Sequence, residues 1–170
     1  MRLTRHTDFA LRVLIFLGLC PNRLASIREI AEAYGISENH LVKVVHGLGR
    51  AGFVETLRGR GGGLRLARPP EAIRIGDVVR RTEEDLALVD CFPPAGRSPH
   101  GGEAGAAQPV GCAIGGCCRL QTVLEEALAA FFAVLDRTTL ADLLPQPDRE
   151  AIVARLRLLV DEPREPARVR

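Results

Sequence analysis

Residues 26–67 read SIREIAEAYGISENHLVKVVHGLGRAGFVETLRGRGGGLRLA, and this stretch decides the fold. Ser26 and Glu29 have capping-box spacing, in which the serine accepts from the Glu29 amide while the carboxylate reaches back, so a helix is expected through Tyr34. Gly35 turns the chain and Ser37 caps a second helix. Its apolar and polar positions fall on opposite faces: Leu41, Val44, Val45 and Leu48 inward, with Asn39, Lys43, His46 and Arg50 outward. Two short helices joined by a tight glycine turn predict a helix-turn-helix.

The second half of the stretch predicts a β-hairpin. Phe53–Leu57 and Leu64–Ala67 are strand-like and flank a tip of four glycines and two arginines, Arg58 and Arg60. Glycine lets such a tip approach a DNA backbone closely, and a guanidinium can enter a narrow minor groove. A solvated turn is the alternative for an isolated Arg-Gly loop, but its place directly after a recognition helix predicts the wing of a winged helix.

The charge is divided unevenly along the chain. Residues 1–81 carry 14 basic and 7 acidic side chains, a net charge of +7, whereas residues 82–170 carry 9 basic and 14 acidic, a net charge of −5. The basic half is therefore the half expected to bind nucleic acid. From the two motifs we expect Ser37, Asn39, His40 and Lys43 to address the major groove, and Arg58 and Arg60 to serve the phosphates or the minor groove.

An amphipathic helix is expected over residues 5–19, with Thr4 as its cap and Asp8 off its apolar stripe. An acidic side chain in a first turn is ordinary helix-dipole chemistry, which is the plain interpretation of Asp8. The start of the chain lacks a convincing export signal, and no run reaches the eighteen or so apolar residues of a membrane span. We expect a cytoplasmic protein with reduced thiols.

Beyond Pro69-Pro70 the sequence predicts a linking helix, an irregular insert and a long helix. The segment Ile73–Arg80 is expected to start the linking helix, which leads toward the cysteines. Residues 92–111 contain nine Gly or Pro, as expected of a mobile loop. Leu120, Leu124, Ala127, Phe131 and Val134 then recur at spacings of four and three, which predicts a seam for a partner helix. A twofold dimer is expected, and packing on the same chain is the alternative.

The chain is thus expected to be mainly α with a small β-wing, a winged helix-turn-helix DNA-binding domain plus a long dimerisation helix. The expected units are a DNA-binding domain (1–70), a linking helix (71–90), a cysteine loop (91–118), a dimerisation helix (119–144) and a partly disordered C-terminal extension (145–170). Within that extension, residues 148–160 could form one more amphipathic helix.

Four of the five cysteines lie between Cys91 and Cys118. Thiolates favour iron–sulfur clusters, zinc or copper(I). Zinc knuckles prefer two to four residues between paired ligands, which neither the gap from Cys112 to Cys118 nor the adjacent Cys117-Cys118 pair fits well. Three cysteines with a fourth ligand from elsewhere suit a cluster better. Free thiols, or a redox-active pair of them, remain the alternative, and an extracellular disulfide framework is a weaker one.

Several motifs together resemble the bacterial family of iron–sulfur and redox-responsive winged-helix regulators, and within it the nitric-oxide-sensing repressors. The motifs are Leu3-Thr4, Thr7-Asp8, Asn39–Lys43, Arg50–Gly52, Arg58-Gly59 with Gly62-Gly63, Ala72–Arg80, Cys118–Leu120 and Thr139–Leu143. The resemblance covers residues 1 to about 144. It implies a homodimeric repressor with a [4Fe-4S] or [2Fe-2S] cluster that reacts with nitric oxide, which releases genes for nitric-oxide detoxification.

Carried onto this sequence, the resemblance implies that Cys91, Cys112 and Cys118 hold the cluster and that Asp8 reaches it from the partner subunit. The chain departs from the family in two places. The insert between Cys91 and Cys112 is far longer than usual, and Cys117 is an additional thiol that could replace a ligand or form a redox pair. Gln121 stands where regulators of cluster assembly have a histidine, which separates the chain from that group.

Other function classes would account for some of the same residues. A cluster-free thiol- or zinc-dependent regulator would use the same cysteines, and a winged helix serving protein interactions would lack salt-dependent DNA affinity. An enzyme is not expected, because the sequence has no paired carboxylates, nucleophile–base set or phosphate loop, and the Gly-rich run lies in a hairpin.

Overall fold

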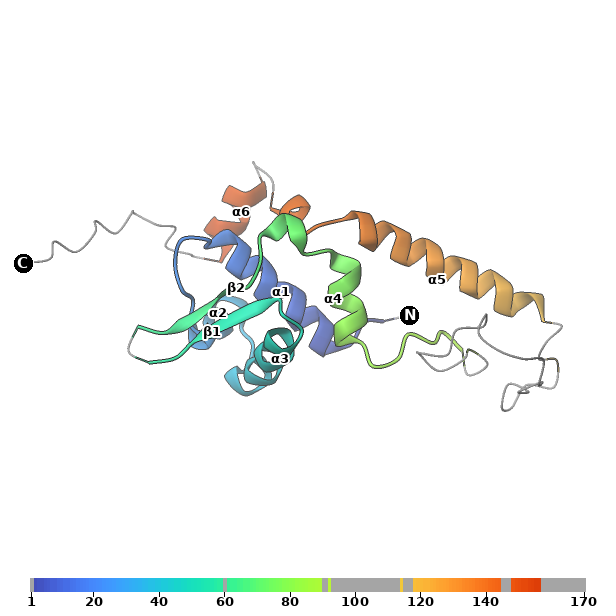
Figure 1. The fold of residues 1–170 in the computed structure, drawn as a ribbon, viewed down its shortest axis with the longest axis horizontal. Helices are drawn as coiled ribbons and strands as arrows, with labels where there is room; N and C mark the ends of the chain where they lie inside the picture. Colours follow the sequence, from blue (N-terminus) through green and yellow to red (C-terminus); the bar gives the residue numbers. More distant parts are fainter. Residues whose placement is uncertain are drawn as a thin grey trace, which may run out of the picture.

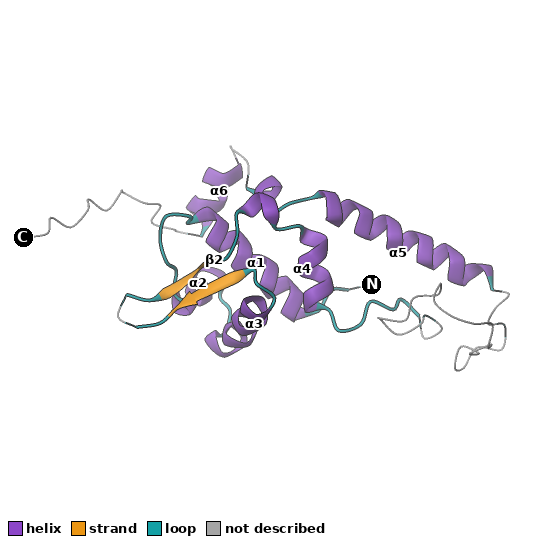
Figure 2. Cartoon of the chain, viewed as in Figure 1, coloured by secondary structure: helices purple, strands orange, loops and turns teal. Residues whose placement is uncertain are grey.

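A computed structural model shows a mainly helical chain with one small sheet in the part that it describes, residues 2–59, 61–89, 92, 114, 118–144 and 148–156 (Figures 1 and 2). The predicted fold class is confirmed. The elements in order are α1 (Arg5–Leu19), α2 (Ile27–Tyr34), α3 (Glu38–Arg50), β1 (Val54–Leu57), β2 (Gly63–Leu66), η1 (Pro70–Ala72), α4 (Ile75–Thr82), α5 (Arg119–Arg137), η2 (Ala141–Leu143) and α6 (Asp148–Arg155).

Helix α1 lies at the centre of the molecule and contributes more residues to the core than any other element that the structure describes. It contacts α3 and β2 on one side and α4 on the other, and α4 in turn contacts α5 (Figure 1). Its side chains at Ala10, Val13, Leu14, Phe16 and Leu19 are completely buried. Burial of apolar area is the dominant favourable term in folding. The elements of the predicted winged-helix domain (1–70), which we term the reading domain, are therefore held together mainly through α1.

The helix starts follow the predicted caps only in part. Thr4 accepts from the Thr7 amide and Ser26 from the Glu29 amide, as predicted. The Glu29 carboxylate, however, does not return to Ser26 but pairs with Arg23. Ser37 occupies the N-cap position of α3 without a capping hydrogen bond from its side chain. The predicted reciprocal capping box is therefore wrong, because Arg23, six residues upstream, binds the Glu29 carboxylate. The predicted side-chain cap by Ser37 is also wrong.

The helix-turn-helix and the hairpin form where the sequence predicts them. Gly35 closes α2 in the left-handed conformation with φ of 63°, which glycine adopts without strain. The inward face of α3 is buried as predicted. Strands β1 and β2 pair antiparallel with Val54 opposite Leu66. Ala25 extends this sheet by a backbone bridge to Leu64, which fixes the hairpin to the segment before α2.

Helix α4 begins at Ile75 rather than at Ile73. Residues 73–75 instead pair through their backbone with residues 138–140: Leu140 N donates to Ile73 O at 2.8 Å and Ile75 N donates to Thr138 O at 3.0 Å. This short bridge brings the C-terminal end of α5 beside the first turn of α4 (Figure 1).

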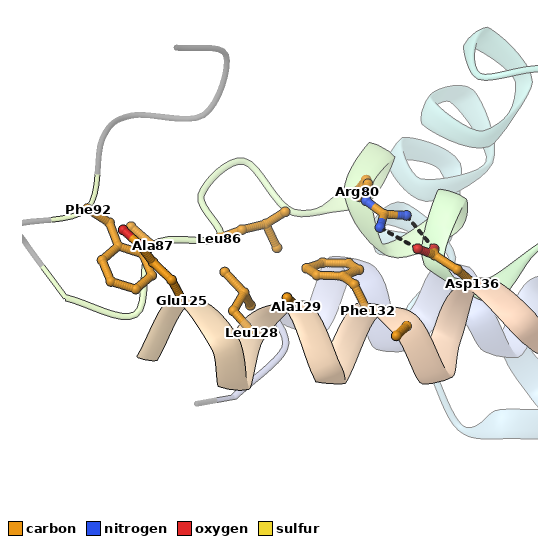
Figure 3. Close-up of a pocket in the computed structure, with 10 residues that line it drawn as sticks. Arg80, Leu86, Ala87, Phe92, Glu125, Leu128, Ala129, Phe132 and Asp136 are labelled. Carbon is orange, nitrogen blue, oxygen red and sulfur yellow. Dashed lines mark hydrogen bonds and ion pairs between the residues drawn. The ribbon is translucent and has the colours of Figure 1, made fainter. Parts of the chain in front are cut away.

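A side-chain contact strengthens the junction of α4 and α5. Arg80 donates twice to Asp136, from Nη1 to Oδ1 at 2.5 Å and from Nη2 to Oδ2 at 2.7 Å, and its guanidinium lies 4.2 Å from the centroid of the Phe132 ring (Figure 3). The pair raises the pKa of Arg80 and lowers that of Asp136. Gly76 makes room for it, because a β-carbon there would collide with the Asp136 carboxylate.

The C-terminal part of the described chain packs back on the body of the molecule. Leu144 lies against Gly18 of α1, and Ile152 and Val153 of α6 and Leu156 directly after it are half-buried against the core. The rest of the predicted helix to residue 160, the tail and the insert at 93–111 lie outside the described residues. None of the helices in the described ranges has the length and apolar character needed to cross a bilayer.

We expect Gly76→Ala to lower the free energy of unfolding, because the new methyl group displaces Asp136 and removes a half-exposed ion pair and its cation–π contact. The control is the same change in an Asp136→Ala background. There the collision is gone, and alanine should stabilise α4 by up to about 1 kcal/mol. Urea denaturation of the four proteins checks this, and an equal cost of Gly76→Ala in both backgrounds would contradict the proposed role of Gly76.

Candidate nucleic-acid interface and cysteine site

The outward face of α3 is polar and not engaged by the rest of the described chain. Ser37, Asn39, His40 and Lys43 are all exposed, as are His46 and Arg50. The side chains of Asn39, Lys43 and His46 make no hydrogen bond or ion pair with any residue that the structure describes. His40 is the exception, since its ring lies 6.3 Å from the ring of Phe9 on α1. The face is thus free to present donors and acceptors to a groove.

The wing has the backbone that its glycines permit. Gly59 and Gly61 have φ of 102° and 83°, the left-handed region that favours glycine, and a β-carbon at Gly62 would collide with the Leu57 carbonyl. Arg58 is exposed and makes no ion pair with the described residues. Arg60 lies outside the described residues. The tip is therefore a tight, side-chain-poor loop with an available guanidinium beside it.

Asp8 lies in the first turn of α1 with 46% of its side chain exposed, and it is fully engaged with Arg12 one turn later. Arg12 Nε donates to Oδ1 at 3.0 Å and Nη2 lies 2.9 Å from Oδ2. The Arg12 guanidinium also lies 5.8 Å from the ring centroid of Tyr34, the last residue of α2. Burial raises the pKa of Tyr34 to about 12 despite this neighbouring cation. Asp8 and Arg12 thus connect the start of α1 to the helix-turn-helix.

Only one of the predicted cluster cysteines belongs to the described part of the chain. Cys118 is the half-buried N-cap residue of α5, at the end of the helix farthest from the reading domain (Figure 1). Cys91, Cys112 and Cys117 lie outside the described residues, and the described ones contain no group of three His, Cys, Asp or Glu side chains able to hold a metal. Cys20 caps the far end of α1 and is buried in the core.

The apolar residues of α5 divide between two adjacent faces. Leu128, Phe131, Phe132 and Leu135 pack on the core or against it, and Leu124 lines a pocket with Leu3 and Leu86 of its own chain. The remaining residues form what we term the α5 stripe, spaced three and four apart and exposed along the helix: Leu120, Val123, Ala127, Ala130 and Val134. Leu124 and Phe131 of the predicted seam are half-buried and line the same pocket of their own chain, which Ala127 also borders. The seam itself stays a prediction.

Comparison with known proteins assigns the family. Residues 3–146 match the family model Rrf2, described as iron-dependent transcriptional regulator. The chain belongs to the Rrf2 family. Transcriptional regulators named NsrR resemble it over most of both chains: that of Bacillus subtilis strain 168 is 50% identical and that of Geobacillus kaustophilus strain HTA426 is 51% identical, each covering 85% of this chain and 90% of the relative. The resemblance inferred from the motifs is confirmed.

Solved Rrf2-type structures confirm the fold. The B. subtilis protein CymR, called the global cysteine regulator, superposes with a TM-score of 0.63 at 26% identity, over 84% of this chain and 95% of CymR. IscR of T. potens has the same fold, with a TM-score of 0.62 at 24% identity, over 89% of this chain and 88% of IscR. Membership among transcriptional regulators also agrees with the prediction that the chain is not an enzyme.

A hydrogen-bond network that the sequence did not reveal holds α1 of this Rrf2 protein to the end of α4. The Glu83 carboxylate accepts from the Thr4 amide at 2.8 Å and from Thr4 Oγ1 at 3.0 Å, and the completely buried Thr7 hydroxyl donates to Thr82 Oγ1 at 2.9 Å. Burial acts to raise the pKa of Glu83, but the hydrogen bonds that its carboxylate accepts from Thr4 outweigh this effect and lower that pKa. The network fixes the Asp8-bearing helix to the point where the chain leaves for Cys91.

Sequence reasoning missed these partners for different reasons. The Asp8–Arg12 pair could have been found, because four residues separate the two charges on one helix. Glu83 with Thr4 and Arg80 with Asp136 are 79 and 56 residues apart, and no local spacing signals such contacts.

Glu83 should make stability depend on pH. Its pKa is lower in the folded chain than the ordinary 4.5, so its contribution is complete above that value and is lost as the pH falls through the lowered pKa. We expect Glu83→Gln to cost about 1 kcal/mol at pH 7 and to cost less as the solution is acidified below the ordinary value. Urea denaturation at pH 7 and at several acidic values measures this. Glu84→Gln, an exposed neighbour, is the matched control, and parallel pH profiles for wild type and Glu83→Gln would refute the role.

Proposed function

We propose that the chain is a cytoplasmic, homodimeric DNA-binding repressor that senses nitric oxide through an iron–sulfur cluster, and that repression ends when nitric oxide reacts with that cluster. The observation that carries the proposal is the similarity to the regulators named NsrR, about half identical over 145 residues. The family description as iron-dependent regulators supports the metal. The free outward face of α3 beside a basic, glycine-rich wing supports the DNA-binding part.

DNA contact is assigned to Ser37, Asn39, His40 and Lys43 for the major groove and to Arg58 and Arg60 for the phosphates or minor groove. A helix-turn-helix presents the N-terminal residues of its second helix to base edges, and these residues occupy the first turns of α3. Arg58 makes no ion pair with a carboxylate among the described residues, so its charge is available to a DNA phosphate.

The α5 stripe is proposed as the dimer interface. Leu120, Val123 and Val134 are 61%, 57% and 47% exposed, although they are large apolar side chains on one helix face. Their spacing of three and four, with alanines between, is that of a helix seam that packs against another helix. A twofold axis along this stripe would also give the two reading domains the symmetry of paired half-sites.

Cys91, Cys112, Cys118 and the partner subunit's Asp8 are proposed as the cluster ligands. The donor set of three thiols and a carboxylate suits iron, and Cys118 lies at the N-terminal, partially positive end of a 19-residue helix, which favours an anionic group. When bound, the cluster would supply the iron that nitric oxide attacks. Both carboxylate oxygens of Asp8 are held by Arg12, so Asp8 must share or give up Arg12 in order to act as a ligand.

A second candidate uses the same cysteines without a cluster. It is favoured by one observation, that CymR of Staphylococcus aureus, which shares this fold at 25% identity and a TM-score of 0.62, has been solved in an oxidized form. Thiol oxidation or zinc binding in the 91–118 segment would then replace the cluster as the signal.

The dimer interface is tested with Val123→Glu, which places a charge at an exposed site of the chain and should not disturb its fold. In a dimer that buries the α5 stripe, this unpaired charge should cost about 3 kcal/mol or more and raise the dissociation constant more than about 100-fold. Thr122→Glu adds the same charge to α5 off the stripe and is the control. Sedimentation equilibrium should show monomers for Val123→Glu alone; a dimer unaffected by Val123→Glu would place the interface elsewhere.

The sensor is tested by visible absorbance with iron and sulfide analysis of protein purified without oxygen. Cys91→Ala, Cys112→Ala and Cys118→Ala should each lose most of the cluster, whereas Cys117→Ala and Cys20→Ala keep it and Asp8→Ala retains a perturbed one. Nitric oxide should bleach the spectrum and abolish binding to operator DNA together.

Three results would count against these assignments. Protein with zinc or with neither iron nor sulfide would favour the second candidate. Loss of the cluster in Cys117→Ala but not in Cys112→Ala would exchange the proposed ligand. Bleaching that leaves DNA affinity unchanged would show that the cluster is not the switch.

A further inference from the structure

The outward face of α3 carries one large apolar side chain, Val42. It is 51% exposed, and the buried stripe of the helix is complete without it. At helical spacing it is a neighbour of Asn39, three residues earlier, and of His46, four residues later, and both are exposed and polar. Val42 therefore interrupts a row of hydrogen-bonding side chains with a group that can neither donate nor accept.

Val42 is not among the apolar side chains of the described chain that form the core or pack against it. A single exposed apolar residue is ordinary on a protein surface. On an exposed helix face, however, valine is a weaker helix former than alanine, lysine or glutamine, and this loss is normally offset by packing. We therefore expect the packing that compensates for valine to come from a partner outside the chain. In the proposed function this face of α3 lies against base pairs.

We propose that Val42 is a specificity-determining residue that contacts the C5-methyl group of a thymine, one in each half-site of the operator. In the major groove thymine is the only one of the four standard bases with a methyl group, and apolar side chains read it by contact. Cytosine would place its amino group in the same region, where a valine leaves the donor unsatisfied. Asn39, Lys43 and His46 surround the contact with side chains that can hydrogen-bond to adjacent base edges.

This inference rests on the proposed function, because it requires that the chain reads a specific DNA sequence. The full-length protein, purified without oxygen, is first used to select binding sites from random duplexes. In the selected duplex each thymine is then replaced in turn by deoxyuridine, which removes the methyl group and keeps the hydrogen-bonding pattern. Affinity is measured for wild type and for Val42→Ala, a change that favours the helix and should not impair folding.

We expect one symmetry-related pair of thymines at which the replacement weakens wild-type binding about four-fold per half-site, from the loss of one buried methyl group. For Val42→Ala the same replacement should have no effect. Affinity for a duplex that lacks the selected site should be equal for the two proteins, because valine contributes nothing to counterion release.

A wild-type profile without any sensitive thymine, or a sensitive thymine that is equally sensitive in Val42→Ala, would overturn the assignment of Val42 while leaving the proposed function intact. Failure to enrich any sequence would instead reject site-specific DNA binding, and the inference with it.

Discussion

Burial of the apolar side chains of α1 is the constraint on which the rest of the structure depends. Its apolar positions are shared between α3 and β2 on one side and α4 on the other, so these elements meet in the core through α1. Since a buried helix cannot shift without opening cavities along its length, the recognition helix and α4 keep a fixed relation to each other. The helix that carries Asp8 is thus also the helix that positions α3.

Helix α5, by contrast, is attached mainly at one end. The backbone bridge between residues 73–75 and 138–140, the Arg80–Asp136 pair and the packing of Phe132 all lie near its C-terminus. From there the helix extends away from the reading domain (Figure 1). Its exposed stripe lies along this helix. A rigid helix held at one end transmits a displacement of its far end to the point of attachment, and here that point is α4, which packs on α1.

The proposed sensing and reading surfaces are therefore joined through few elements. Glu83 ties the start of α1 to the end of α4, and Arg12 links Asp8 to the last residue of α2. These contacts are polar, partly exposed and limited in number, whereas the core beneath them is apolar and dense. Contacts of this kind can exchange partners at modest energetic cost. They would therefore suit a regulator that alternates between two states.

The sequence by itself determined the local elements. Helical periodicity, glycines at the turns and the alternation of the hairpin predicted α1, α2, α3, the wing and α5 to within a few residues, because caps, turns and face patterns are encoded between residues close in the chain. The outward set on α3 followed from the same periodicity.

Only the tertiary structure decided which partners meet across the chain. Glu29 pairs with Arg23 rather than with Ser26, α4 starts two residues late because Ile73 pairs with Leu140, and Gly76 is required by a carboxylate 60 positions away. The two apolar faces of α5 lie side by side on the helix, so periodicity could not tell which residues pack on their own chain and which are left exposed. That division depends on how α4 and α5 are docked, and docking depends on contacts between residues far apart in the sequence.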